Sequence, residues 1–153
     1  ARAAGPSPTT TFVRLTLLTV GKLRDRWVAE GCAEYMARLR GRFTIEIIEV
    51  KRDAEVLARL PARQTLWVLD ERGEQATSRE LAARLERVRG SGGAGLTLCI
   101  GGADGHSDAL RARADYLWSL SRLTLPHRLA RVVVLEQIYR ATSILAGAPY
   151  HHD

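Results

Sequence analysis

Short apolar runs rich in β-branched residues alternate with segments of helical periodicity along most of this chain. The runs predict strands at Val13–Val20, Phe43–Val50, Leu66–Leu69, Leu96–Ile100 and Tyr116–Leu120. Parallel strands need long crossover connections, so strands separated by helical segments are typical of a mostly parallel sheet. Because Leu96–Ile100 is apolar without a break, we expect it to be covered on both faces. The alternation therefore predicts an α/β fold with helices on both faces of the sheet.

The segments between the strands carry the helical signals. Val28, Cys32, Tyr35, Met36 and Leu39 recur at helical spacing and would form one apolar stripe. They predict a helix that ends at Gly41. Thr77 and Glu80 have the spacing of a capping box, which predicts a helix that begins there. Two shorter helices are expected at residues 51–60 and 107–114, and the chain shows no internal repeat.

The last element combines two conflicting signals. Val132–Val134 favours a strand by propensity, yet the apolar residues from Leu129 to Ile144 have helical spacing up to Gly147. A run of about 18 residues is too long for an ordinary strand. The sequence therefore predicts a helix here.

The composition is that of a single globular domain. The chain has 153 residues, of which 46% are hydrophobic and 26% are charged. These values exclude a disordered chain, a collagen-like repeat and a disulfide-rich miniprotein. Residues 12–153 are expected to form one domain. Ala1–Thr11 is small, polar and proline-containing, so we expect a disordered extension there.

The charge favours a polyanionic partner. The formal net charge is +6, and almost all basic residues are arginines. Between Arg111 and Arg140 six arginines face only two acidic residues, which makes the C-terminal third the candidate contact face. Charge alone is as compatible with a membrane surface, or with no partner, as with nucleic acid.

Cysteine and histidine spacing predicts neither a disulfide framework nor a metal site. Cys32 and Cys99 are far apart and neither belongs to a Cys-x-x-Cys motif, so both are interpreted as reduced core thiols. No metal spacing relates the four histidines, which are His106, His127, His151 and His152. No apolar run approaches the roughly 20 residues of a membrane-spanning helix, and the start of the chain lacks a signal core. We therefore expect no membrane partner and a cytoplasmic location.

Three short segments are candidates for ligand binding. Leu69-Asp70 and Gly101–Gly105 follow predicted strands, and the carboxyl ends of parallel strands are where open α/β sheets bind ligands. The glycines admit either a close ligand or merely a tight turn. Ser121–His127 interleaves leucines with polar residues, so either the core or an adenine-like ring would cover those leucines. Glu136 and Arg140 have ion-pair spacing, which fits a surface pair or, if buried, a site.

Taken in order, several motifs resemble the bacterial RlmH family of SPOUT-class ribosomal RNA methyltransferases. The resemblance spans about residues 12–153. The motifs are Leu17-Leu-Thr-Val-Gly21-Lys22, Glu34-Tyr35, Ile48-Glu49-Val50, Leu69-Asp70, Ile100-Gly101-Gly102-Ala-Asp-Gly105, Leu120-Ser-Arg-Leu-Thr-Leu-Pro-His127, Glu136-Gln-Ile-Tyr-Arg140-Ala and Pro149-Tyr-His151.

The resemblance implies a fold, a cofactor and a reaction. It implies a C-terminal trefoil knot, a rare exception to the rule that chains do not knot, and a homodimer. It implies methyl transfer from S-adenosylmethionine to N3 of a pseudouridine in the helix 69 loop of 23S rRNA, on assembled ribosomes. The residues implied for the cofactor are Leu69, Asp70, Gly101, Gly102, Ser121, Arg122, Leu123, Thr124, Leu125 and Pro126.

The resemblance also directs attention to the C-terminal residues for catalysis and RNA binding. The expected catalytic residues are Arg140, His151, Tyr150, Glu136 and His127, because N3 must lose a proton beside a base or a cation. The expected phosphate contacts are Arg111, Arg113, Arg122, Arg128 and Arg131. The alternatives are a non-catalytic RNA-binding or ribosome-associated module of the same fold, and a small-molecule enzyme. Relative to the family, the segment between Lys51 and Gln64 looks short, and Arg128 adds charge after His127.

Overall fold

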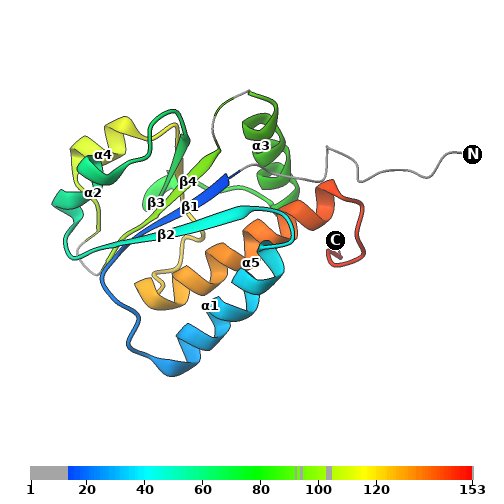
Figure 1. Ribbon diagram of the computed structural model, residues 1–153, viewed down its shortest axis with the longest axis horizontal. Coiled ribbons are helices and arrows are strands. Elements are labelled where there is room, and N and C mark those ends of the chain that lie inside the picture. Colours follow the sequence, from blue (N-terminus) through cyan, green and yellow to red (C-terminus); the bar gives the residue numbers. More distant parts are fainter. Residues whose placement is uncertain (1–13, 92, 94, 103–104, 153) are drawn as a thin grey trace, which may run out of the picture.

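The computed structural model describes residues 14–91, 93, 95–102 and 105–152, in which strands and helices alternate as expected (Figure 1). The disordered extension expected at Ala1–Thr11 lies outside the described residues. The elements are β1 (Arg14–Val20), α1 (Arg26–Leu39), β2 (Thr44–Val50), the 3-10 helix η2 (Asp53–Glu55), α2 (Val56–Arg59), β3 (Thr65–Glu74), α3 (Ser78–Gly90), β4 (Leu96–Ile100), α4 (Asp108–Arg113), β5 (Tyr116–Trp118) and α5 (His127–Leu145).

Within the described residues, five parallel strands form one sheet in the order β2-β1-β4-β3-β5. Because every pair is parallel, the carboxyl ends of all strands lie at the same edge. The central strand β4 is buried along its whole length, as its unbroken apolar sequence predicts. The predicted α/β fold with a parallel sheet is confirmed.

Alternate strand residues enter two separate cores, one on each face of the sheet. Leu15 and Leu17 of β1 pack in a core that α1, α3 and α5 cover. Leu18 of β1 faces the other core, which contains Val56 of α2 and Leu110 of α4. Figure 1 shows α1 and α5 together on one side of the sheet and α2 and α4 on the other. The expected helices on both faces are thus present.

The capping box predicted at the start of α3 is confirmed. Thr77 Oγ1 accepts a hydrogen bond from the Glu80 backbone N–H at 3.1 Å, and Glu80 Oε1 accepts one from the Thr77 backbone N–H at 2.9 Å. The hydrogen bond from the Thr77 backbone to the Glu80 carboxylate is the main reason that the pKa of Glu80 is lowered. Two backbone donors that α3 cannot satisfy internally are thereby paired.

The helix predicted for the C-terminal element is α5, so tertiary packing overrides the β propensity of its valines. Val134, Leu135 and Ile138 are buried in the core that α1 and α3 also cover. At Gly31 of α1 the two helices approach closely, since a Cβ there would lie 3.4 Å from Val132 Cγ1. Burial of this apolar face outweighs the few tenths of a kcal/mol by which valine disfavours a helix.

Two strand ends differ from the prediction by more than one residue. β3 continues past Asp70 to Glu74, and β5 ends at Trp118 rather than Leu120. The pairing of β3 with β5 has a register shift between Leu69 and Glu74. The Gly73 backbone passes so close to the β5 backbone that a side chain would not fit there. Such an irregularity depends on the partner strand, so it is invisible in the sequence.

Both cysteines lie in the interior of the protein. Cys32 and Cys99 are both free and buried, as predicted, and burial raises the pKa of the Cys99 thiol to about 12. Among the helices in the described part of the chain, none has both the length and the apolar character needed to cross a membrane.

Candidate functional site

A cavity of about 530 Å³ opens at the edge of the sheet where β3, β4 and β5 end. Three segments far apart in the sequence form most of its wall, namely residues 69–72, residues 100–102 with 105–106, and residues 119–121 with 123–127. Its volume lies within the roughly 300–1,000 Å³ typical of small-ligand sites. Its position matches the edge where parallel α/β sheets bind ligands.

The structure brings together all the residues expected to hold the cofactor except Arg122. Those that line the cavity are Leu69, Asp70, Gly101, Gly102, Ser121, Leu123, Thr124, Leu125 and Pro126. Arg122 lines a neighbouring hollow of about 560 Å³, which shares Ser121, Leu123 and Thr124 with the cavity. Arg122 is therefore placed for a contact outside the cavity rather than within it.

The cavity wall combines bare backbone with apolar side chains. A Cβ at Gly101 would lie 2.9 Å from the His106 ring, and one at Gly102 would lie 3.4 Å from Val20 Cγ1. A side chain at Gly101 would thus collide with the His106 ring, whereas one at Gly102 would be in van der Waals contact with Val20. As glycines, both residues line the cavity with their backbone alone. Leu123 lies at the rim with 75% of its surface exposed, which is unusual for a large apolar residue. Backbone donors and acceptors beside apolar walls suit a flat heterocycle with a polar edge.

Several cavity residues are not among those expected to hold the cofactor. They are Glu71, Arg72, Ile100, Gly105, His106, Arg111, Ser119, Leu120, His127 and Ala130. Of these, Gly105 and His127 lie in segments predicted to bind a ligand, His127 was also expected in catalysis, and Arg111 was expected to contact RNA. Most of them adjoin predicted positions along the chain. Arg111 and Ala130 reach the cavity through the packing of α4 and α5, which the sequence does not encode locally.

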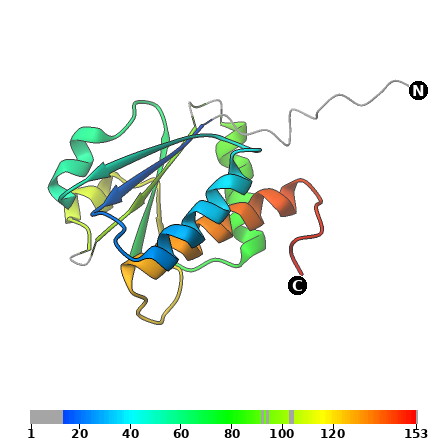
Figure 2. The ribbon, with the colours of Figure 1, turned by 60° about the horizontal axis from the view of Figure 1, so that its bottom comes forward.

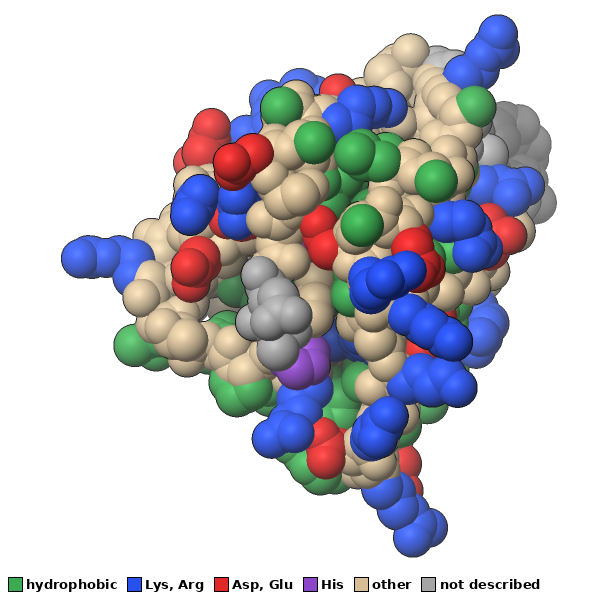
Figure 3. All heavy atoms as spheres, turned by 90° about the vertical axis from the view of Figure 1, so that its left-hand side faces the viewer, with side chains coloured by type: hydrophobic (Ala, Val, Ile, Leu, Met, Phe, Trp, Pro, Cys, Tyr) green, Lys and Arg blue, Asp and Glu red, His purple; other side chains and the backbone are tan. Residues whose placement is uncertain are grey.

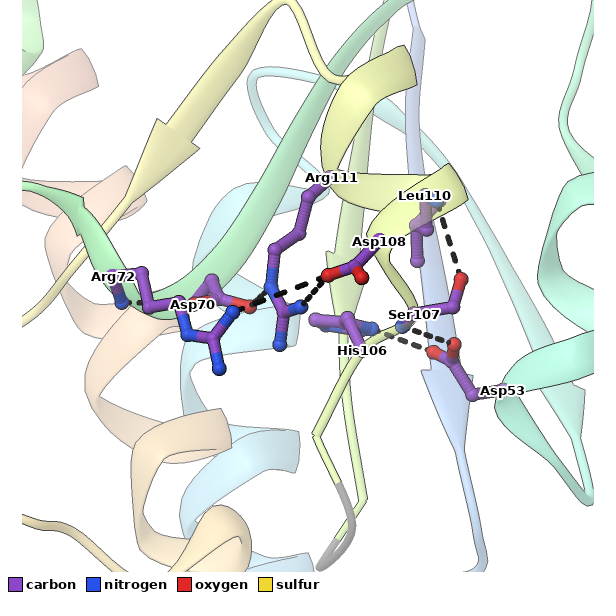
Figure 4. Close-up of polar contacts among 8 residues, drawn as sticks. All are labelled: Asp53, Asp70, Arg72, His106, Ser107, Asp108, Leu110 and Arg111. Carbon is purple, nitrogen blue, oxygen red and sulfur yellow. Dashed lines mark hydrogen bonds and ion pairs between the residues drawn. The ribbon is translucent and has the colours of Figure 1, made fainter.

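Asp70 braces the cavity wall through both of its carboxylate oxygens (Figure 4). Its Oδ2 accepts a hydrogen bond from Arg111 Nε at 2.7 Å, and its Oδ1 accepts one from the Arg72 backbone N–H at 2.8 Å. Arg111 Nη1 also donates to Asp108 Oδ1 at 2.8 Å. The hydrogen bond to Asp70 raises the pKa of Arg111. Arg111, expected on RNA, is therefore engaged in joining the second half of β3 to α4.

The other expected catalytic residues form a second cluster around the C-terminal half of α5. Glu136 Oε2 accepts hydrogen bonds from Arg140 Nη2 at 2.6 Å and from Tyr150 Oη at 2.8 Å. Arg140 Nη1 lies 3.1 Å from His151 Nδ1. Because a guanidinium only donates, this His151 nitrogen is the acceptor. The structure thus assembles Glu136, Arg140, Tyr150 and His151 as one network.

The network controls the protonation of its members. Burial by itself would raise the pKa of Glu136, but hydrogen bonds from Arg140, Tyr150 and Gln137 hold it below the ordinary value. The pKa of Tyr150 is raised by burial and by hydrogen bonding to Tyr35 and Glu136. Glu136 therefore stays ionised and Tyr150 stays protonated near neutral pH.

The cavity and this network lie at opposite ends of α5. His127 begins the helix and lines the cavity, whereas Arg140 is thirteen residues further along, which corresponds to about 20 Å. Figure 2 shows the segment before α5 at one end of that helix and the C-terminal tail at the other. Within one chain the two groups of expected site residues are therefore not brought together.

The expected RNA-contact arginines divide into exposed and buried ones. Arg113, Arg122 and Arg128 are exposed. Arg131 is only 5% exposed and its Nη2 lies 3.5 Å from the carbonyl oxygens of Val20 and Gly21. Burial lowers its pKa. The structure thus places Arg131 against the end of β1 rather than on the surface, where a phosphate contact was expected.

The surface at the cavity end of the molecule is mixed in charge with a basic excess. Figure 3 views the molecule from the side on which α5 begins, and Lys and Arg side chains cover more of this face than Asp and Glu do.

Among the described residues, no group of three or more His, Cys, Asp and Glu side chains could hold a metal ion.

Comparison with known proteins defines the class. The family model described as "Predicted SPOUT methyltransferase" matches residues 13–151, so the chain belongs to the SPOUT methyltransferases. Solved structures agree at the level of the fold. A probable methyltransferase from Bordetella pertussis has a TM-score of 0.56 at 11% identity, covering 88% of this chain and 96% of its own. The methyltransferase AviRb from Streptomyces viridochromogenes, solved with AdoMet, has a TM-score of 0.51 at 16% identity, covering 90% of this chain and 60% of its own.

Curated relatives narrow the class to one family. Ribosomal RNA large subunit methyltransferase H from Geobacter metallireducens is 44% identical over 92% of this chain and 100% of its own length. The protein of the same name from Synechococcus sp. strain RCC307 is 47% identical over 92% of this chain and 95% of its own. The chain therefore belongs to the RlmH family, and the predicted resemblance is confirmed. The trefoil knot that this resemblance implies stays a prediction.

Proposed function

We propose that this protein transfers a methyl group from S-adenosylmethionine to N3 of a pseudouridine in the helix 69 loop of 23S rRNA, on assembled ribosomes in the cytoplasm. One observation carries the proposal. The three segments that the family resemblance assigns to the cofactor, far apart in sequence, line one cavity at the carboxyl edge of the sheet.

The residues of the cavity fit S-adenosylmethionine. The peptide groups of Gly101 and Gly102 can bind polar edges, and Leu123 and Leu125 can cover the adenine faces. When bound, the cofactor supplies a methyl group that its sulfonium already activates. The protein must then mainly align the base with that methyl group and exclude water.

The C-terminal network supplies the groups that N3 needs. N3 must lose its proton as the N–CH3 bond forms. The proposed recipient is His151 Nδ1, which accepts a hydrogen bond from Arg140 in the structure and takes the N3 proton when Arg140 turns from it to the pyrimidine oxygen. Arg140 stabilises the negative charge that develops on the pyrimidine oxygens. Glu136, which hydrogen bonds keep ionised, holds Arg140 and Tyr150 in position rather than accepting the proton. His127, at the cavity itself, helps to orient the base.

The separation of cavity and network along α5 supports a homodimer. A network about 20 Å from the cavity of its own chain can act only at the cavity of another copy. A second copy that places its tail beside the first cavity would complete both sites by symmetry. Exposed Arg113, Arg122 and Arg128 are the proposed phosphate contacts, and Arg122 lies in the hollow that adjoins the cavity.

The decisive experiment measures methyl transfer from labelled S-adenosylmethionine. Intact ribosomes, free 23S rRNA and free nucleosides are compared as substrates, and the labelled fragment is mapped by mass spectrometry. We expect label on the helix 69 pseudouridine of ribosomes only. Label on nucleosides would indicate a small-molecule enzyme, and cofactor binding without transfer to any substrate would indicate a non-catalytic module.

An Arg140→Ala variant tests the assigned network. We expect transfer to fall about 100-fold or more, the usual loss when one charge-stabilising donor is removed, while cofactor binding is unchanged. The matched control is Arg87→Ala, which removes an exposed arginine from α3. Equal activity of the Arg140 variant and this control would remove Arg140 from the mechanism.

A further inference from the structure

A carboxylate that does not line the cavity is bonded to the segment that does. Asp53 lies in η2, more than fifty residues before that segment. Its Oδ1 is 2.7 Å from His106 Nδ1, and its Oδ2 accepts a hydrogen bond from the Ser107 backbone N–H at 2.8 Å. Figure 4 shows Asp53 on one side of this segment and the Asp70–Arg111 pair on the other.

The His106 ring packs against Gly101 in the cavity wall. The ring occupies the space that a side chain at residue 101 would need, since a Cβ there would be 2.9 Å from its Cε1 and Nε2. Only 2% of the His106 side chain is exposed, and its Nε2 has no hydrogen-bond partner among the described residues. The contact with Asp53 is therefore the polar interaction that orients the ring. A carboxylate only accepts, so Nδ1 carries the proton that is shared with it.

The hydrogen bond from Ser107 to Asp53 links Asp53, through α4, to the part of the cavity wall that contains Asp70. Ser107, whose N–H binds Asp53, caps α4 by accepting a hydrogen bond from the Leu110 backbone N–H at 3.2 Å. From α4, Arg111 donates a hydrogen bond to Asp70 of β3. The Asp53 carboxylate thus holds the His106 ring, which packs against Gly101. It also holds the start of α4, the helix from which Arg111 binds Asp70.

We propose that Asp53 is a positioning residue for the cofactor cavity, which acts through His106 on Gly101 and through Ser107 on α4. The inference rests on the proposed function, because it concerns the affinity for the same cofactor. Asp53 does not line the cavity. Its loss frees the His106 ring and the segment that carries Gly101 and Gly102.

The two bonds predict a graded series of variants. Asp53→Asn keeps an oxygen acceptor for the Ser107 N–H but loses the charge-assisted bond to His106, whereas Asp53→Ala removes both bonds. The matched control is Glu55→Gln in the same short helix, because the Glu55 carboxylate contacts Arg52 and the Lys51 backbone instead. Calorimetry with S-adenosylhomocysteine measures the affinity of each full-length variant. We expect Kd to rise at least tenfold for Asp53→Ala, by a smaller factor for Asp53→Asn, and not at all for Glu55→Gln.

Two further readouts separate positioning from general stability. Hydrogen exchange on the ligand-free protein should be faster in the peptide that spans Gly101 and His106 for Asp53→Ala than for Glu55→Gln. In turnover, KM for the cofactor should rise while kcat at saturating cofactor stays within twofold. His106→Leu should also raise Kd, and its effect should not add fully to that of Asp53→Asn, because both break the same contact.

The outcomes distinguish this inference from the proposed function. A Kd of Asp53→Ala equal to that of the wild-type protein would overturn the inference alone. A wild-type protein that binds no S-adenosylhomocysteine would refute the proposed function, and the inference with it. If Asp53→Ala does not fold, Asp53→Asn decides, and an unchanged Kd and exchange rate in that variant would overturn the inference.

Discussion

The hydrogen bond from Tyr150 to Glu136 offers a quantitative test of the C-terminal network. Tyr150→Phe removes the hydroxyl that donates to Glu136 Oε2 at 2.8 Å, while the ring can keep its edge-to-face contact with Tyr139 at 4.8 Å. A hydrogen bond to a charged group contributes about 1.5–3 kcal/mol when fully buried. Glu136 is only partly buried and keeps its bonds to Arg140, so we expect a loss of about 1 kcal/mol at pH 7.

The pH dependence of this loss follows from the direction of the Glu136 shift. The folded state lowers the pKa of Glu136, so its ionised interactions stabilise the protein above the unfolded pKa and are lost as pH falls through the folded one. Removal of the Tyr150 hydroxyl raises the folded pKa toward the unfolded value. The difference in unfolding free energy between the wild-type protein and Tyr150→Phe should therefore be largest near neutral pH and shrink below about pH 4.

Urea unfolding of both proteins between pH 3 and pH 7 measures this difference. The matched control is Tyr139→Phe, because its ring packs against Tyr150 but, among the described residues, no hydrogen bond joins it to Glu136. A loss that is the same at pH 3 and pH 7, or equal in the two variants, would refute the assignment of the effect to the Glu136 carboxylate.

Three other perturbations test separate parts of the structure. Leu123→Ala should weaken S-adenosylhomocysteine binding about tenfold in calorimetry, yet leave the melting temperature of the free protein unchanged, because Leu123 is already 75% exposed. Thr77→Ala should lower the unfolding free energy by about 1 kcal/mol in urea through loss of the α3 cap, with cofactor affinity unaltered; a variant as stable as the wild type would contradict the capping role. Arg128→Ala should make the slope of log K for ribosome binding against log salt concentration shallower by about 0.9, the value for one phosphate contact. An unchanged slope would exclude Arg128 from the RNA surface.

The fold was predictable to a large extent because its signals are local. The burial pattern of β4, the capping box at Thr77 and the helical period of α5 are properties of adjacent residues, and all three were confirmed. The extension of β3 to Glu74 was not predictable, because it depends on pairing with β5 at a shifted register.

The sequence predicted which segments line the cavity, but it did not predict which contacts the individual side chains make. The glycines after β4 and the leucines before α5 line the cavity as expected. Arg111 and Arg131 look alike in a count of basic residues, yet one joins Asp70 across the cavity wall and the other is buried against β1. Their direction is set by how α4 and α5 pack on the sheet.

The sequence by itself determined the order and type of the elements, the glycine and leucine segments that surround the cavity, and the family to which the chain belongs. Only the tertiary structure decided that Asp53 holds His106, that Arg131 is buried, and that Arg140 lies far from the cavity of its own chain. The physical reason is that propensity, periodicity and capping act over a few neighbouring residues. Contacts between residues fifty positions apart exist only after the packing of helices on the sheet has fixed which side chains face each other.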